Sequence, residues 1–320
     1  MDEKTVHLPE SQIRKLELLG YRRLNSADYP VFDPYYDKMN AHWSCAAGFL
    51  SFVAWSGTFP LFYKRAGELL VCLEYEFGEW AAIPFLGHYS SDTVSHAFRV
   101  LQSDMEALQV PLLIIEVSPW MLPFYQETGV SWEITDNRDL MDYVYQKTDL
   151  LASMEKSDSR YRYRYFTRKY APETIVLTKE HQRECLECME TIWCPHRSCS
   201  DCNYGCPKEA VSRVLGEYDN LQADGLLVRV NERAVGFCIV TCRNGLGIYY
   251  FKYADNHLKG INEYLLRECL NRFLSGADEI NYTDDMGIES LRAHKSRLSP
   301  YTLLPKLRLR ETKRRMPPVL

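Results

Sequence analysis

Residues able to carry out acyl or phosphate chemistry are concentrated in one stretch near the carboxyl end of the chain, Asn281–Leu298. It contains two adjacent carboxylates, Asp284 and Asp285, which could orient or deprotonate an attacking amine or hydroxyl group. Arg292 and Lys295 follow three residues apart, so on a helix they share one face and could bind a phosphate or stabilise an oxyanion. We therefore predict catalytic roles for these four residues. The alternative is a solvated helix start whose acids are favoured by the helix dipole.

The sequence around these residues predicts the elements that position them. Glu279–Thr283 is typical of a short strand and Ile288–Arg297 of a helix, which makes Asp284–Gly287 the loop between them. Open sheets bind ligands at loops that follow the carboxyl ends of their strands. We therefore expect the two acids in such a loop and the two cations on the helix that leaves it.

A second candidate site lies where a predicted strand, Gly247–Tyr253, leads to a predicted helix, Ile261–Leu274. A glycine and unpaired backbone amides at a helix N-terminus favour a phosphate group. We predict that this junction binds the donor substrate through Lys259, Gly260 and Asn262 at the helix start and through Tyr250 and Lys252 on the strand. Its glycine content is lower than in the Gly-x-Gly loops of acyltransferases that use coenzyme A. A plain helix entry is the alternative.

Basic and aromatic residues alternate in the segment Arg160–Lys169. This pattern suits phosphate neutralisation combined with stacking on exposed bases, and we predict that Arg164 and Arg168 contact the donor. A solvated helix explains half of the pattern without a ligand, because Arg160, Arg164 and Arg168 then line one face while Tyr161, Tyr165 and Phe166 pack inward.

Four cysteines, Cys194, Cys199, Cys202 and Cys206, follow one another at Cys-x4-Cys-x2-Cys-x3-Cys spacing in the loop 194–206. Thiolates this close in sequence can converge on one metal ion, and four suffice for tetrahedral zinc. An iron–sulfur cluster is the less favoured alternative, and reduced cysteines in a plain loop are a third interpretation. A metal here would have a structural or regulatory role.

Hydrophobic periodicity predicts the same order of elements in both halves of the chain. In the first half, three strand candidates within 61–84 precede an amphipathic helix at Asp92–Leu108 and a buried strand at Pro111–Val117. In the second half, Asn244-Gly245 is a strong hairpin signal, because both residue types tolerate positive φ. A last strand is expected near Thr302–Leu309.

The repeated order predicts an α+β fold of two tandem domains, each a mixed, mostly antiparallel sheet flanked by helices. We place the domains at 1–147 and 148–320, each large enough for its own core. Charge is unevenly shared: residues 1–150 carry a net charge of -10 and residues 151–320 a net charge of +5. A basic half can attract a polyanion such as tRNA or a phosphorylated cofactor, although uneven surface charge without a partner is the alternative.

The chain has no apolar run of the roughly 18 residues that a spanning helix needs. Its amino terminus also lacks a signal-peptide pattern. We therefore expect a cytoplasmic protein without a transmembrane segment. Its 11 cysteines would then be reduced thiols or metal ligands and not a disulfide framework.

The run from Asp285 to Ser296 reads Asp-x-Gly-x-x-x-Leu-Arg-x-x-Lys-Ser. It resembles the signature of the phosphatidylglycerol lysyltransferase C-terminal-like family, and the likeness extends to Asp142-Tyr-Val-Tyr145 and Asp149-Leu-Leu151 upstream. The resemblance implies paired acyltransferase-type (GNAT-like) domains and an aminoacyl-tRNA donor. Lipid-modifying members of the family are embedded by a separate membrane part, so its absence here makes a lipid acceptor less favoured.

We interpret the chain as a soluble acyl- or aminoacyl-transferase. The donor would be an aminoacyl-tRNA or an acyl-coenzyme A, and the acceptor an amine or hydroxyl group of a small molecule or peptide. The alternative is a non-catalytic module that binds RNA or protein and carries a structural metal loop, and a plain amine acetyltransferase is a third interpretation. The sequence leaves open the acceptor, the transferred group, the metal and the oligomeric state.

Overall fold

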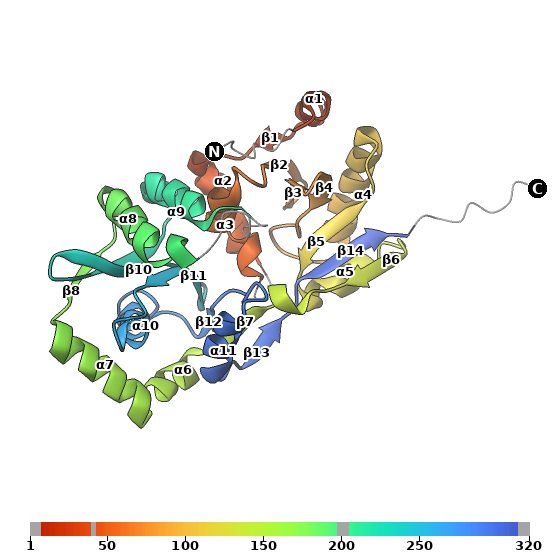
Figure 1. Ribbon diagram of the computed structural model, residues 1–320. Helices are drawn as coiled ribbons and strands as arrows, with labels where there is room; N and C mark the ends of the chain where they lie inside the picture. The colour runs from red at the N-terminus through yellow and green to blue at the C-terminus, as the bar shows by residue number, and fades with distance from the viewer. Residues whose placement is uncertain (1–7, 40–42, 197–204, 313–320) are drawn as a thin grey trace, which may run out of the picture. The chain divides into compact units, whose positions relative to one another are not determined.

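The computed structural model describes residues 8–39, 43–196 and 205–312 (Figure 1). The chain forms two compact units: unit 1 comprises Met1–Arg138 with Leu304–Leu320, and unit 2 comprises Asp139–Leu303. Within the described residues, no helix combines the length and the apolar character needed to cross a membrane.

Unit 1 is built on one mixed, mostly antiparallel sheet. Its strands lie in the order β1 (Arg22–Arg23), β2 (Leu61–Ala66), β3 (Leu69–Glu76), β4 (Glu79–Ala82), β5 (Leu113–Val117), β14 (Leu307–Glu311) and β6 (Trp132–Thr135). The helices of this unit are α1 (Glu10–Leu18), α2 (Tyr29–Tyr36), α3 (Phe49–Trp55), α4 (Ser91–Leu108) and α5 (Leu122–Gln126). The apolar face of α4 packs into the core of the unit, as the 3.6-residue period of its buried side chains predicts.

Unit 2 repeats this plan. Its strands lie in the order β13 (Thr302–Leu304), β7 (Asp142–Gln146), β12 (Glu279–Asn281), β11 (Leu246–Ala254), β10 (Arg233–Arg243), β9 (Asp224–Val230) and β8 (Glu173–Val176). Its helices are α6 (Lys147–Met154), α7 (Ser157–Tyr170), α8 (Gln182–Ile192), α9 (Pro207–Gly216), α10 (Ile261–Arg272) and α11 (Glu289–Arg297). The predicted turn between β10 and β11 is confirmed, with φ of 48° at Asn244 and 78° at Gly245.

The two halves of the chain exchange a strand. β7 follows the first half in sequence, yet it pairs with β12 in the sheet of unit 2, with Tyr145 opposite Ile280. β14 comes from the end of the chain and pairs with both β5 and β6 in unit 1, where Leu309 lies opposite Ile114 and Ile134. Figure 1 shows the exchange as blue β14 beside yellow β5 and β6.

The exchange corrects the expected boundary near Lys147. The units divide between Arg138 and Asp139, and the chain returns to unit 1 at Leu304. The single last strand expected near Thr302–Leu309 is two strands in different sheets, because Pro305 between them has no N–H for a ladder hydrogen bond.

Candidate functional site

Asp285, in the loop after β12, is fully buried and accepts hydrogen bonds on both carboxylate oxygens. Arg292 donates through Nε to Oδ2 (3.0 Å) and through Nη2 to Oδ1 (2.9 Å). The hydroxyl of Tyr143 donates to Oδ2 (2.6 Å), and the backbone N–H of Gly287 donates to Oδ1 (2.9 Å). Burial alone would raise the pKa of Asp285, but the bonds from Arg292, Tyr143 and Gly287 outweigh it and hold the pKa below its usual range.

These contacts occupy both oxygens of Asp285, and its predicted part in proton transfer stays a prediction. A carboxylate whose pKa lies well below neutral and whose oxygens are occupied is a poor proton acceptor. Asp285 fixes the loop to Arg292 on α11 and to Tyr143 on β7.

Arg292 is bound by two carboxylates, because Nη2 also donates to Asp139. The two partners raise its pKa, Asp285 more than Asp139. A side chain at Gly287 would place its Cβ 2.9 Å from Oδ2 of Asp139, and the φ of +72° at this position also favours glycine. The charge of Arg292 is therefore compensated by Asp285 in the loop and by Asp139 ahead of β7, whereas the sequence suggested a cation aimed at a phosphate or an oxyanion.

Lys295 is buried and its ammonium group caps the same loop. Nζ donates to the carbonyl oxygens of Tyr282 (2.6 Å) and Asp284, and to Oγ1 of Thr283 (3.2 Å). Since an ammonium group has three N–H donors, these contacts occupy all of them. Lys295 thus holds the backbone of the loop, in which Thr283 has a φ of 57°.

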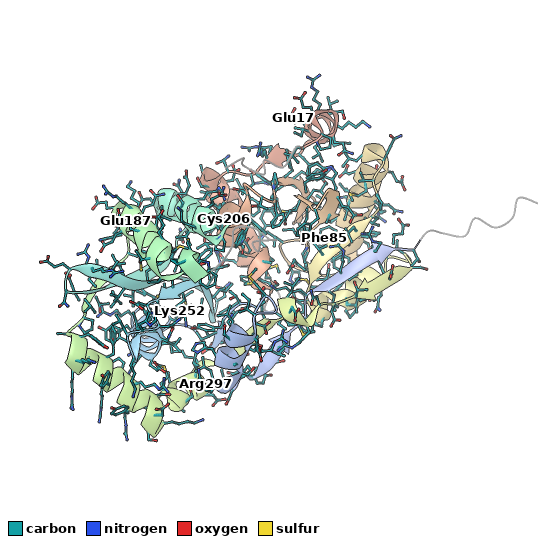
Figure 2. All side chains as sticks on the ribbon, viewed as in Figure 1. Glu17, Phe85, Glu187, Cys206, Lys252 and Arg297 are labelled. Carbon is teal, nitrogen blue, oxygen red and sulfur yellow. The ribbon has the colours of Figure 1, made fainter. Side chains whose placement is uncertain are left out.

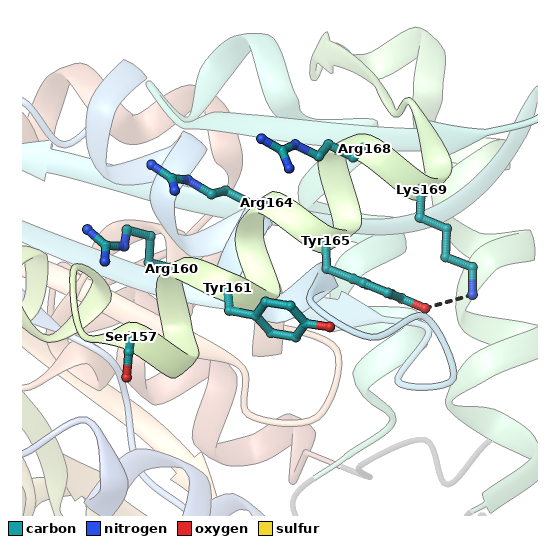
Figure 3. A pocket seen from close by; sticks show the side chains of 7 residues that line it. All are labelled: Ser157, Arg160, Tyr161, Arg164, Tyr165, Arg168 and Lys169. Carbon is teal, nitrogen blue, oxygen red and sulfur yellow. Dashed lines mark hydrogen bonds between the residues drawn. The ribbon is translucent and has the colours of Figure 1, made fainter.

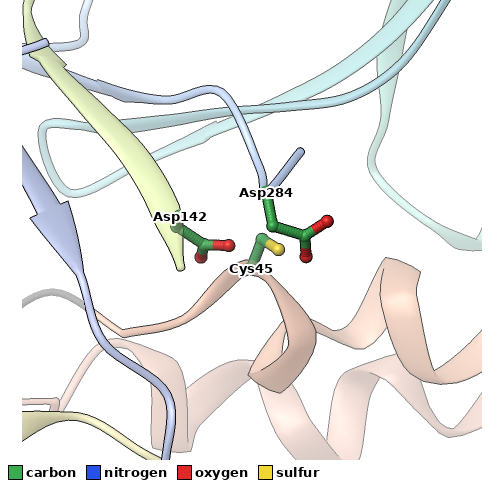
Figure 4. A group of neighbouring side chains, drawn as sticks. All are labelled: Cys45, Asp142 and Asp284. Carbon is green, nitrogen blue, oxygen red and sulfur yellow. The ribbon is translucent and has the colours of Figure 1, made fainter. Parts of the chain in front are cut away.

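Asp284 differs from Asp285 in being half-buried. One of its carboxylate oxygens lies within 4.8 Å of a carboxylate oxygen of Asp142, which begins β7 (Figure 4). Asp142 is fully buried and accepts a hydrogen bond from Nδ2 of Asn281 (2.8 Å). The sequence assigned no role to Asp142 or to Tyr143. Their place in the Asp142-Tyr-Val-Tyr145 run was the signal in the sequence. Their hydrogen-bond partners, Asn281 and Asp285, lie about 140 positions further along the chain.

Lys252, labelled in Figure 2, lies half-buried on β11. Its Nζ is 3.3 Å from Nε2 of His294 on α11 and 5.7 Å from the centre of the Tyr282 ring. Tyr250 is also half-buried and lies at a bulge, since the pairing of β10 with β11 passes from Phe251 to Tyr249 and omits it. The sequence reasoning missed His294, which lies two positions after Arg292.

The start of α10 is covered by α7. Gly260 has a φ of +97°, and a Cβ there would lie 2.1 Å from the carbonyl oxygen of Arg162 and 3.0 Å from Cβ of Phe166. Nδ2 of Asn262 donates to Oδ1 of Asn256 (2.8 Å) and is engaged locally. Glycine is therefore needed at position 260 because two backbones approach closely, and phosphate binding by Gly260 and Asn262 stays a prediction.

Lys259 belongs to the same contact between α7 and α10. Its Nζ lies 4.8 Å from the ring centre of Tyr161 and 5.4 Å from that of Tyr165. Cation–π attraction at these distances holds the two rings beside a positive charge.

Three arginines line one face of α7 at intervals of four residues, which is about 6 Å along a helix. Arg160, Arg164 and Arg168 border a groove with Ser157, Tyr161, Tyr165 and Lys169, and Figure 3 shows the three guanidinium groups side by side. In the part of the chain that the structure describes, none of the three forms an ion pair. Arg162, on another face of α7, forms ion pairs with Asp158 (2.9 Å) and Glu263 (3.9 Å).

The aromatic residues of α7 separate into two groups. Phe166 is fully buried, as the helical interpretation predicts, but Tyr161 is 53% exposed and lines the groove. The expectation that Tyr161 packs inward is therefore wrong, and the groove presents both cations and ring faces.

The cysteine cluster is described only in part. Cys194 and Cys206 are half-buried. Cys199 and Cys202 lie outside the described residues, so the four-cysteine zinc site stays a prediction.

Comparison with known proteins identifies what the whole chain resembles. A family model described as phosphatidylglycerol lysyltransferase, C-terminal, matches residues 40–309. A search of curated proteins found no match.

Solved structures share the fold over nearly the whole chain. A protein of unknown function from Bacteroides thetaiotaomicron is 20% identical with a TM-score of 0.81, over 91% of this chain and 99% of that one. The structure of L-PGS from Bacillus licheniformis is 12% identical with a TM-score of 0.58, over 99% of this chain and 96% of that one. FemX is 10% identical with a TM-score of 0.56, over 91% and 96%. The predicted α+β fold of two tandem GNAT-like units is confirmed.

Proposed function

This chain belongs to the family described as phosphatidylglycerol lysyltransferase, C-terminal, and from that premise we propose that it transfers an aminoacyl group from aminoacyl-tRNA to an amine or hydroxyl group. The observation that carries the choice of donor is the arginine face of α7. Three cations that have no carboxylate partner among the described residues lie beside two tyrosine rings, and such a surface suits a nucleic-acid backbone with exposed bases.

The start of α10 supports tRNA over an acyl-coenzyme A donor. A helix N-terminus binds a phosphate when its backbone N–H groups face open space. At α10 the backbone of α7 lies against this end of the helix: a Cβ at Gly260 would be 2.1 Å from the carbonyl oxygen of Arg162. This close approach disfavours a pyrophosphate at the junction, whereas the groove of α7 suits a polyanion.

We assign the loop after β12 to the acceptor. Asp284 is half-buried and would orient the attacking amine or hydroxyl group. Asp285, Arg292 and Lys295 would act through Asp284 by fixing the loop backbone. The acceptor would be a small molecule or peptide.

A non-catalytic module that binds RNA is the second candidate, and the internal pairing of Asp285 with Arg292 favours it because it leaves less charge for chemistry. Binding of tRNA is common to both candidates. Consumption of the aminoacyl ester separates them, since only a transferase shortens the lifetime of the ester.

The test compares two charge reversals of equal size. Arg164→Glu with Arg168→Glu changes the groove, and Lys179→Glu with Arg183→Glu changes exposed residues that pair with Asp219 and Glu187. We expect the groove variant to bind total tRNA about 100-fold more weakly in filter binding, with a salt slope lower by about 0.7–0.9 per lost phosphate contact. Equal losses in both variants would contradict a donor site on α7.

We also propose that Cys194, Cys199, Cys202 and Cys206 hold zinc, with an iron–sulfur cluster as the alternative. Four thiolates at this spacing suit either group. Elemental analysis of the purified protein, compared with a Cys194→Ser, Cys206→Ser variant, tests it. A wild-type protein with neither zinc nor iron would exclude both.

A further inference from the structure

Lys252 and His294 form a pair of titratable side chains in unit 2. Lys252 lies on β11 and His294 on α11, with 3.3 Å between Nζ and Nε2. Both residues are half-buried. The centre of the Tyr282 ring lies 5.7 Å from Nζ of Lys252.

The charges around this pair do not fix Lys252 as an ammonium ion. Among the described residues, Lys252 has no ion pair with a carboxylate. Burial, followed by the charge of Lys295 on α11, lowers the pKa of Lys252 to about 8, against the opposing effects of Glu263 on α10 and Cys238 on β10.

His294 is neutral at physiological pH. Burial lowers its pKa to about 3, and the charges of Lys252, Arg297 and Lys295 add to this effect. His294 therefore holds the nitrogen of Lys252 through a hydrogen bond without adding a counter-charge.

One buried tyrosine hydroxyl close to the pair lacks a hydrogen-bond partner among the described residues. It belongs to Tyr282, which is 4% exposed and whose ring centre lies 4.8 Å from that of the buried Tyr249. Buried hydroxyls are nearly always satisfied, so such groups indicate a place that water or a ligand completes. The Tyr282 ring contacts both Lys252 and His294, with 6.4 Å between the Tyr282 and His294 ring centres.

We propose that Lys252 is the proton-transfer residue of acyl transfer and that His294 is its positioning residue; this inference rests on the proposed function. The amine form of Lys252 takes the proton of the attacking N–H or O–H group as the new bond forms to the carbonyl carbon of the donor. The bond from that carbon to the ribose oxygen breaks, and the lysine ammonium gives its proton to this oxygen. Lys252 returns to the amine form, so the step needs no further reactant.

A neutral histidine suits this role better than a carboxylate would. A carboxylate at the same distance would stabilise the ammonium form and raise the pKa of Lys252. A general base acts best when its pKa lies near the working pH. Substitution of His294 by glutamate should therefore change the pH at which Lys252 loses its proton.

The first experiment follows hydroxylaminolysis of a pool of aminoacyl-tRNAs between pH 6 and 10, under single-turnover conditions. We expect the wild-type rate to rise with pH through an inflection near 8. Lys252→Met should lower the rate at least 100-fold, while its affinity for total tRNA changes less than twofold. Lys252→Arg should behave in the same way, because a guanidinium group keeps its proton over this range.

The histidine variants and one control complete the experiment. His294→Gln should keep the inflection, and His294→Glu should move it up by about one pH unit. Lys179→Met, at an exposed lysine paired with Asp219, is the matched control and should leave rate and inflection unchanged. A full rate in Lys252→Met, or an unmoved inflection in His294→Glu, would overturn the proposal.

A second measurement needs no donor. Trinitrobenzenesulfonate labelling of lysines across the same pH range, read by peptide mass spectrometry, should give a midpoint near 8 for Lys252 and a higher midpoint in His294→Glu. A midpoint above 10 for Lys252 in the wild type overturns the inference. Labelling as expected, without ester consumption by the wild type, overturns the proposed donor and leaves the amine form of Lys252 established.

Discussion

The helix that follows the strand meander begins differently in the two units. In unit 1, α4 is capped by its own residues: Oγ of Ser90 accepts from the N–H of Thr93 (3.2 Å), and Oγ1 of Thr93 accepts from the N–H of Ser90 (3.0 Å). In unit 2, α10 has no side-chain cap, and Gly260 brings its first turn against the backbone of α7. The first turn of α4 is capped by residues next to it in sequence, whereas the first turn of α10 packs against α7, about 100 residues earlier in the chain. The helix that carries the basic groove is therefore packed against α10 within unit 2.

The loops after β5 and β12 extend this comparison. In unit 1, β5 leads within two residues to the turn Pro119–Met121, and the strand acid Glu116 accepts a hydrogen bond from the hydroxyl of Ser44 (2.9 Å). In unit 2, the loop acid Asp285 is bound by an arginine of the following helix. Similar sheets thus support a hydrogen bond from a serine hydroxyl to an acid in one unit and an ion pair in the other.

The largest expected effect comes from Gly260→Ala. Its Cβ would overlap the carbonyl oxygen of Arg162, so α7 must move, and we expect a loss of about 3–5 kcal/mol in the free energy of unfolding. The matched control is Gly78→Ala in unit 1, where φ is also positive (+89°) but no atom lies within 4 Å. The control should lose about 1–2 kcal/mol from strain alone. Urea denaturation measures both, and equal losses would mean that α7 does not close the start of α10.

Asp285→Asn should have the next largest effect, about 2–3 kcal/mol, because it weakens charged hydrogen bonds to a buried group. Asp139→Asn is the control: it removes the other partner of Arg292, which is 49% exposed, and should cost less than about 1 kcal/mol. Thermal and urea denaturation of the two variants measure the difference. Losses of equal size would show that the loop does not depend on the buried pair.

Asp285 should also make the stability of the protein depend on pH. The pKa of Asp285 is lower in the folded state than the value of about 3.9 for an unfolded chain. Its contribution is therefore complete above about pH 5, begins to fall near the unfolded-state pKa and is lost as the pH falls through the folded-state pKa. Urea midpoints between pH 3 and 6 should fall less steeply in Asp285→Asn than in the wild type. Parallel curves would exclude Asp285 as a source of the acid sensitivity.

Ser90→Ala gives the smallest effect, since it removes one cap of α4. We expect a loss of about 1 kcal/mol. Ser103→Ala, at an exposed position inside the same helix, should instead gain a few tenths of a kcal/mol through helix propensity. Losses of the same size at both positions would argue that the cap does not stabilise α4.

Local patterns predicted most elements of this fold, because periodicity and turn residues act over a few positions. The helix expected at Asp92–Leu108 is Ser91–Leu108, and the Asn244-Gly245 hairpin is present. The exchange of β7 and β14 was not predictable from such patterns, because Tyr145 pairs with Ile280 and Leu309 with Ile114. Pro305 was the one local signal that the last strand is divided.

For the candidate site, the sequence by itself determined the types and spacing of the charged residues: adjacent acids at Asp284 and Asp285, and Arg292 and Lys295 on one helix. Tertiary structure decided which of them face each other, because pairing depends on distances between segments that the chain brings together only when folded. Arg292 is thereby neutralised by Asp285, whereas Arg164 and Arg168 have no carboxylate partner among the described residues. The pairing of Lys252 with His294 has the same origin, since it joins a strand to a helix 42 positions later.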